Sequence, residues 1–251
     1  MEKISIEINI DENEVLRYLG YKGQKIEEEL LLKIRDTIEE GKKLFAPKVI
    51  YKEYPINILE NGVDVVGTTL VLEDISKDEN VIVSFKKSTA SYNDIKKLLI
   101  GSNRCILMAA TIGNYIEKKI RLYERIDLTR GMILDSVSTT AVEELCDKVC
   151  ALIEKDIIED FEDLTFRYSP GYGDLSLNIQ KNFIEVLDAT RKIGVNASEH
   201  MLLFPRKSVT AIVGIRKKLG KKTKKSCINC KNYENCLYRK EENSCGFKGV
   251  Y

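Results

Sequence analysis

The stretch that organises this sequence is Arg167-Tyr168-Ser169-Pro170-Gly171-Tyr172-Gly173-Asp174. Proline fixes its own φ and glycine readily adopts a positive φ, so Pro170 and Gly171 suit the central positions of a type II turn. Because Gly171 and Gly173 lack a Cβ, a ligand can lie directly on the backbone there. The guanidinium of Arg167 matches a carboxylate or phosphate, and the ring of Tyr172 can stack on a purine or attract a cation. A plain strand-to-helix turn with a surface arginine explains the same residues.

Composition and length indicate a folded protein without a secretory leader. The 251 residues are 43% hydrophobic and 31% charged, which allows one large domain or two small ones with an ample core. A formal net charge of +1 argues against wholesale binding of nucleic acid. The N-terminal residues lack the pattern of a signal peptide, and no apolar run is long enough to span a bilayer. We therefore expect a cytoplasmic protein, whose cysteines serve metal binding, redox chemistry or core packing instead of disulfides.

The pattern of apolar residues predicts an α+β fold, with a mostly antiparallel twisted sheet and flanking helices. Helices and strands alternate without a regular βαβ rhythm, and Asn61-Gly62 is a hairpin signal. Isoleucines alternate with polar residues over 4–10, which is typical of a strand with one buried face. Helices are predicted over 13–18, 25–44, 90–100, 115–123, 127–155 and 179–193. Strands are predicted over 4–10, 47–59, 63–72, 81–85, 104–111 and 165–168, with a hairpin or paired strand over 201–215.

The segments around the quoted stretch resemble the activation domain of cobalamin-dependent methionine synthase. Arg167, Gly171 and Tyr172 match the R-x-x-x-G-Y motif of that family. The segments that follow keep the family's order, namely a helix ending at Ile193-Gly194, then Ala197-Ser198-Glu199, Phe204-Pro205 and Ser208-Val209-Thr210. The resemblance is good over 104–215, weak before that, and does not include the C-terminal cysteines. Because folate, homocysteine and cobalamin domains are missing, the chain resembles a free-standing activation protein.

This resemblance implies a function in the reactivation of methionine synthase. The chain would bind S-adenosylmethionine and support the reductive methylation of cob(II)alamin, which takes one electron and a methyl group. Arg167 would pair with the methionine carboxylate, Ser169 and Gly171 would offer backbone groups, and Tyr172 would pack near the nucleoside or sulfonium. The implied partners are a cobalamin-dependent methionine synthase and a flavodoxin- or ferredoxin-type electron donor. No catalytic acid or base is expected, because the cobalt itself performs the attack.

Two features depart from the family pattern. Gly173-Asp174-Leu175 replaces a segment rich in proline and cysteine, and the acidic residue that holds the ligand in the family has no counterpart near the N-terminus. These departures keep a second function open, a non-catalytic redox or docking adaptor for a corrinoid methyltransferase. Service to a corrinoid protein other than methionine synthase is a third alternative.

A basic run and a cysteine cluster occupy the C-terminal part of the sequence. Seven of the ten residues 216–225 are basic, which is typical of a solvated linker and also suits docking to an acidic partner. Cys227, Cys230, Cys236 and Cys245 have the spacing C-x2-C-x5-C-x8-C, which predicts a four-thiolate metal site. Zinc and an iron–sulfur cluster both accept four thiolates, and the electron needed for reactivation favours iron–sulfur. The predicted organisation is an activation-like domain (1–215), a basic linker (216–226) and a metal-binding tail (227–251).

The remaining cysteines and the single histidine are weaker candidates for chemistry. Cys105 lies in an apolar segment and is expected in the core. Cys146 and Cys150 are one helical turn apart, where buried thiols are the simpler interpretation than metal ligands. His200 is expected at the surface or at a helix cap, and the sequence offers no cysteine–histidine or serine–histidine pair for hydrolysis.

Overall fold

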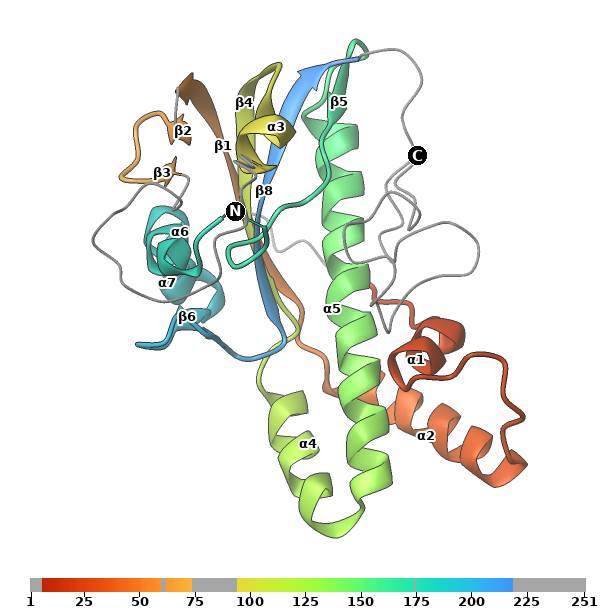
Figure 1. Ribbon diagram of the computed structural model, residues 1–251. Coiled ribbons are helices and arrows are strands. Elements are labelled where there is room, and N and C mark those ends of the chain that lie inside the picture. The colour runs from red at the N-terminus through yellow and green to blue at the C-terminus, as the bar shows by residue number, and fades with distance from the viewer. Residues whose placement is uncertain (1–5, 60–61, 74–93, 174, 219–251) are drawn as a thin grey trace, which may run out of the picture.

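The computed structural model of the chain describes residues 6–59, 62–73, 94–173 and 175–218, and its main feature is one twisted sheet with helices on both faces (Figure 1). The helices are α1 (Glu12–Tyr18), α2 (Glu28–Leu44), α3 (Asp94–Leu99), α4 (Tyr115–Ile126), α5 (Leu128–Asp156), the short 3-10 helix η2 (Leu177–Ile179), α6 (Gln180–Leu187) and α7 (Ala189–Ile193). The strands are β1 (Lys48–Leu59), β2 (Gly62–Val65), β3 (Val71–Glu73), β4 (Ser102–Thr111), β5 (Glu162–Leu164), β6 (Asn196–Ala197), β7 (Leu203–Phe204) and β8 (Ser208–Lys217).

The six-stranded sheet has the order β3-β2-β1-β4-β8-β5, and every neighbouring pair is antiparallel. The last strand in sequence, β8, therefore lies inside the sheet and separates β4 from β5. Strands β6 and β7 form a separate pair beside it. The predicted α+β class with an antiparallel sheet is confirmed.

The residues of β4 alternate between two cores, one on each face of the sheet. Cys105, Leu107 and Ala109 face a cluster with α3, α6 and α7. The intervening residues face the second cluster, which is covered by α4 and the long helix α5. Strand β4 is buried on both faces, which explains why its sequence is a continuous apolar run. A third, smaller cluster joins α1 and α2 to α5.

Two of the predicted strands differ from the structure, and a third lies outside the described residues. Residues 6–10 of the predicted first strand pair with none of the described strands. Ile8 is buried and Glu7 is exposed, so the alternation reflects one-sided burial. The predicted strand over 63–72 is split into β2 and β3 by a turn in which Gly67 has φ +78°. The predicted strand over 81–85 lies outside the described residues, as does Asn61 of the predicted hairpin turn.

The segment around the quoted stretch also differs in detail from the prediction. Strand β5 ends before residue 165, and Tyr168 forms only an isolated bridge to Ile212. The predicted helix over 179–193 is divided into α6 and α7, because Asp188 adopts a left-handed conformation with φ +55°. The hairpin alternative for 201–215 is wrong, because β7 and β8 do not pair with each other. The paired-strand alternative is confirmed, since β8 pairs with β4 and β5 and continues to Lys217, inside the predicted linker.

Candidate ligand pocket

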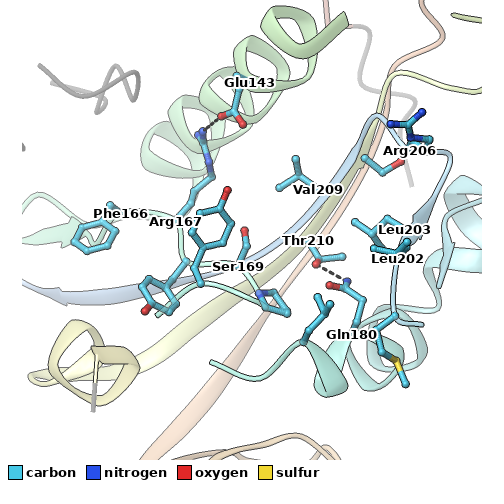
Figure 2. Close-up of a pocket in the computed structure, with 16 residues that line it drawn as sticks. Glu143, Phe166, Arg167, Ser169, Gln180, Leu202, Leu203, Arg206, Val209 and Thr210 are labelled. Carbon is cyan, nitrogen blue, oxygen red and sulfur yellow. Dashed lines mark hydrogen bonds and ion pairs between the residues drawn. The ribbon is translucent and has the colours of Figure 1, made fainter. Parts of the chain in front are cut away.

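A pocket of about 390 Å³ lies where the quoted stretch faces β8 and α5 (Figure 2). Its walls come from α5, from residues 166–172, from the start of α6, from residues 201–206 and from β8. Among the predicted site residues, Arg167, Ser169 and Tyr172 line this pocket. Gly171 is not a lining residue, but it forms the turn that places Tyr172 at the edge.

The turn has the features expected of type II. Gly171 has φ +90°, and the backbone N–H of Tyr172 donates to the carbonyl of Ser169 at 3.2 Å. A Cβ on Gly171 would lie 3.3 Å from a methyl carbon of Leu177, and one on Gly173 would lie 2.0 Å from the hydroxyl oxygen of Tyr168. In this structure the space beside the two glycines is therefore filled by the side chains of Leu177 and Tyr168.

Arg167 is buried and already holds two carboxylates of α5. Its guanidinium donates to Glu143 at 3.0 Å and to Asp147 at 2.5 Å, and one nitrogen lies 3.8 Å from the sulfur of Cys150. Only 7% of the Arg167 side chain is exposed. The arginine thus fixes the quoted stretch to α5 by charge-assisted hydrogen bonds.

Glu143 is the acidic group of the pocket, and the sequence alone did not identify it. Its side chain is 33% exposed and lines the cavity, in contact with Arg167. Burial raises the pKa of Glu143 and the nearby charge of Asp147 raises it further, while Arg167 opposes both effects. The signal in the sequence was the spacing of Glu143, Asp147 and Cys150, which places them on one side of the predicted helix.

A buried polar pair forms part of the pocket wall. The side-chain amide of Gln180 donates to the hydroxyl of Thr210 at 2.6 Å, and both residues are almost fully buried. Thr210 belongs to a segment that carried the resemblance, whereas Gln180 was not predicted. Since both groups line the cavity, they are available to orient a polar ligand atom.

Exposed apolar side chains surround the mouth of the pocket. Tyr172 and Leu202 are 69% and 63% exposed, and Phe166 and Leu177 are also exposed. All four line the cavity (Figure 2). Exposed apolar side chains that gather at one place are typical of a surface that contacts a ligand or a partner.

The described cysteines have no metal-site arrangement. Cys105, Cys146 and Cys150 are free and buried, as expected, and burial raises the pKa of Cys105 to about 12. Within the described ranges, no group of three or more His, Cys, Asp or Glu residues is placed to hold a metal ion. The predicted ligands Cys227, Cys230, Cys236 and Cys245 lie outside the described residues. His200 is exposed, in agreement with the expected surface position.

Comparison with known proteins identifies the fold. No family model matches the sequence, and no curated protein matches it. A crystal structure of the MetH reactivation domain bound to AdoHcy matches with a TM-score of 0.60 and 15% sequence identity, covering 85% of this chain and 75% of that chain. The chain has the fold of this reactivation domain. At 15% identity this likeness establishes the fold alone.

Among the described helices, none is long and apolar enough to cross a membrane.

Proposed function

We propose that the chain binds S-adenosylmethionine in the described pocket and supports reductive methylation of cob(II)alamin on a corrinoid protein, most simply a methionine synthase. The observation that carries this proposal is the position of the R-x-x-x-G-Y segment, which forms a wall of the pocket in a reactivation-domain fold. A structure of that fold is described as bound to AdoHcy, the product left when S-adenosylmethionine loses its methyl group.

The groups of the pocket fit such a ligand. Its volume of about 390 Å³ is within the range of small-molecule sites. The rings of Tyr172 and Phe166 offer faces for a purine, and the Gln180–Thr210 pair offers polar atoms. Glu143 provides a carboxylate for a positively charged sulfonium or ammonium group, and so fills the role that the sequence left without a candidate.

In the proposed reaction this chain binds and orients the ligand, and it supplies no catalytic acid or base. One electron from a flavodoxin- or ferredoxin-type donor reduces the partner's cobalt, and the methyl group then passes from sulfur to cobalt while the C–S bonding electrons stay on sulfur. The protein holds the sulfonium methyl in line with the attack and keeps water away. The exposed apolar margin supports the docking of a corrinoid protein over the pocket.

We also propose that Cys227, Cys230, Cys236 and Cys245 hold an iron–sulfur cluster or zinc. We propose as well that the protein works in the cytoplasm. The spacing of these cysteines supports a four-thiolate site, and a cluster would supply the electron that zinc cannot. Anaerobic purification with metal analysis tests this. Visible charge-transfer absorption with bound iron supports the cluster, and one zinc per chain without such absorption would show that the tail is structural.

Calorimetric titration of S-adenosylmethionine into the wild-type protein and into Tyr172→Ala tests the main proposal. Tyr172 is 69% exposed, so its removal should leave folding intact and weaken binding by roughly tenfold through lost ring contact. Tyr115→Ala is the matched control, because Tyr115 is 63% exposed on α4 and does not line the pocket. Equal binding by the wild type and Tyr172→Ala would place the ligand elsewhere. Transfer of a labelled methyl group to reduced methionine synthase completes the test.

The internal pairing of Arg167 favours a second candidate, the docking adaptor. The charge of Arg167 is already neutralised by Glu143 and Asp147. The same pairing would be expected if the site had lost its ability to bind a ligand. The adaptor function predicts a complex with a corrinoid protein in the absence of any affinity for S-adenosylmethionine. Calorimetry of both interactions with the same preparation separates the two functions.

A further inference from the structure

We infer that Arg206 binds the carboxylate of the bound S-adenosylmethionine and that Arg167 acts as a positioning residue for Glu143. This assignment rests on the proposed function, because it names the residue that recognises one end of the proposed ligand. It differs from the role that the resemblance implied, in which Arg167 meets the carboxylate directly.

The contacts of Arg167 oppose direct recognition of a ligand carboxylate. Its two terminal nitrogens donate to Glu143 and Asp147, and 93% of its side chain is hidden from solvent, since 7% is exposed. A ligand carboxylate would have to displace one of these anions and remain beside the other. Separating a buried arginine from its carboxylate leaves an uncompensated charge, which is costly.

Arg206 has the opposite properties. It lines the pocket from the connection between β7 and β8, and it is exposed. Its backbone N–H donates to Glu117 at 3.2 Å, which fixes the residue without using its side chain. Among the described residues, no hydrogen bond or ion pair engages its guanidinium, so both terminal nitrogens can meet a carboxylate side by side.

The neighbouring cation cannot replace Arg206. The ammonium of Lys207 contacts Asp135 and Thr139 of α5, each at 2.8 Å, and it does not line the cavity. Among the described residues that line the pocket, Glu143 is the acidic one, and Arg206 is the cation whose side chain has no ion pair. Figure 2 shows these two residues on separate elements, with Val209 between them in the view. This arrangement suits a ligand that carries a positive charge and a carboxylate at different positions.

A thermodynamic cycle with decarboxylated S-adenosylmethionine tests the assignment. This probe keeps the adenosine, the sulfonium and the amine but lacks the carboxylate. We expect the wild type to bind the probe roughly tenfold more weakly than S-adenosylmethionine, as for loss of one charge-assisted contact near a surface. Arg206→Ala should bind both compounds with the affinity that the wild type shows for the probe. The exposed Arg125→Ala on α4 is the control and should behave as the wild type.

Each outcome of the cycle decides the assignment. A preference for S-adenosylmethionine that persists in Arg206→Ala would overturn it, and loss of that preference only in Arg167→Lys would return the carboxylate to Arg167. Absence of binding by both compounds in the wild type would reject the proposed function together with the inference. Thermal melting of each variant confirms that folding is unchanged, which is expected because Arg206 and Arg125 are both exposed.

Discussion

Arg167 connects the quoted stretch to α5, and its contacts make it a determinant of stability. The guanidinium lies against Glu143 and Asp147, which are one helical turn apart on the same helix. Without the arginine, these carboxylates would repel each other in a partly buried place. Any loss of ligand binding in an Arg167 variant must therefore be compared with its folding.

We predict that Arg167→Ala lowers the free energy of unfolding by about 3 kcal/mol, as for removal of one partner from a buried ion pair. Urea denaturation measures the change. The triple variant Arg167→Met, Glu143→Gln, Asp147→Asn is the control, and it should recover part of the loss because no charge is left unpaired. Unchanged stability of Arg167→Ala would contradict the structural role described for this residue.

The pocket-lining residues that the sequence predicted lie close together in the chain. Arg167, Ser169 and Tyr172 were predicted because a short motif and a turn preference act locally, and all three line the pocket. Glu143 and Gln180 were missed, since each reaches the pocket from a separate helix and only the packing of the fold brings them to the quoted stretch. The spacing of Glu143 with Asp147 and Cys150 placed them on one side of a helix without indicating a ligand, and Gln180 carried no signal beyond its place at the start of a helix.

At the scale of elements, β8 combines the core of the sheet with a wall of the pocket. Gly214 in this strand lies where a Cβ would come within 2.7 Å of both Leu99 and Ser102, and within 3.1 Å of Thr165. Its N–H also donates to the hydroxyl of Thr165 at 2.8 Å. The missing side chain thus permits α3 and the segment after β5 to pack closely on the strand.

We predict that Gly214→Ala lowers the free energy of unfolding by about 2 kcal/mol, because the added methyl group overpacks the core. Gly194→Ala provides the control, because Gly194 has a positive φ of +75° and open space around the missing Cβ. Backbone strain alone should cost that variant about 1 kcal/mol. Chemical denaturation compares the two, and an equal or smaller loss for Gly214→Ala would show that the strand can shift.

The junction of α2, α4 and α5 should make stability depend on pH. Burial raises the pKa of Glu40, but hydrogen bonds from Tyr123 and Lys119 and the charge of Arg130 outweigh it, so the pKa is lowered from the ordinary value of 4.5. A lowered pKa in the folded state means that the ionised carboxylate stabilises the fold above the ordinary value. This stabilisation is lost as the pH falls through the lowered pKa.

We predict that Glu40→Gln is less stable than the wild type by about 1–2 kcal/mol near neutral pH. The difference should shrink progressively as the pH falls below 4.5, because the wild-type carboxyl group then becomes protonated. Urea titrations over this pH range measure it, with Glu39→Gln on the exposed side of α2 as the control. A difference that does not vary with pH would rule out the charge of Glu40 as its cause.

Long elements with a clear period were predicted well, and short or special ones were not. Helix α5 and strand β4 agree closely with the sequence pattern, because burial of a helix stripe or of both strand faces leaves a strong signal. The strand expected over 4–10 failed because one-sided burial does not require a pairing partner. The division at Asp188 depends on a left-handed residue that no local preference demanded.

At the scale of the whole molecule, the described part of the sheet extends into the predicted linker. The last register pairs join Lys217 to Glu162 and Arg216 to Asp163, and the N–H of Lys218 donates to the carbonyl of Phe161 at 2.8 Å. The edge of the sheet therefore depends on residues that the sequence pattern assigned to the linker.

We predict that a chain ending at residue 218 keeps its fold and its affinity for S-adenosylmethionine but binds no metal. A chain ending at residue 215 should be less stable by about 1–3 kcal/mol, because it loses the pairing of the β5 edge. Thermal melting, calorimetry and metal analysis of the two chains test this. Equal melting temperatures would show that the pairing after residue 215 contributes nothing.

The position of β8 inside the sheet also has a consequence for folding during synthesis on the ribosome. Thr111 of β4 pairs with Ser208 of β8, almost a hundred residues later, so one edge of β4 stays unpaired with β8 until that later segment has been synthesised. Its apolar residues await a strand that is translated last among the described elements. During that interval the nascent chain exposes an apolar strand edge that is prone to pair with other chains.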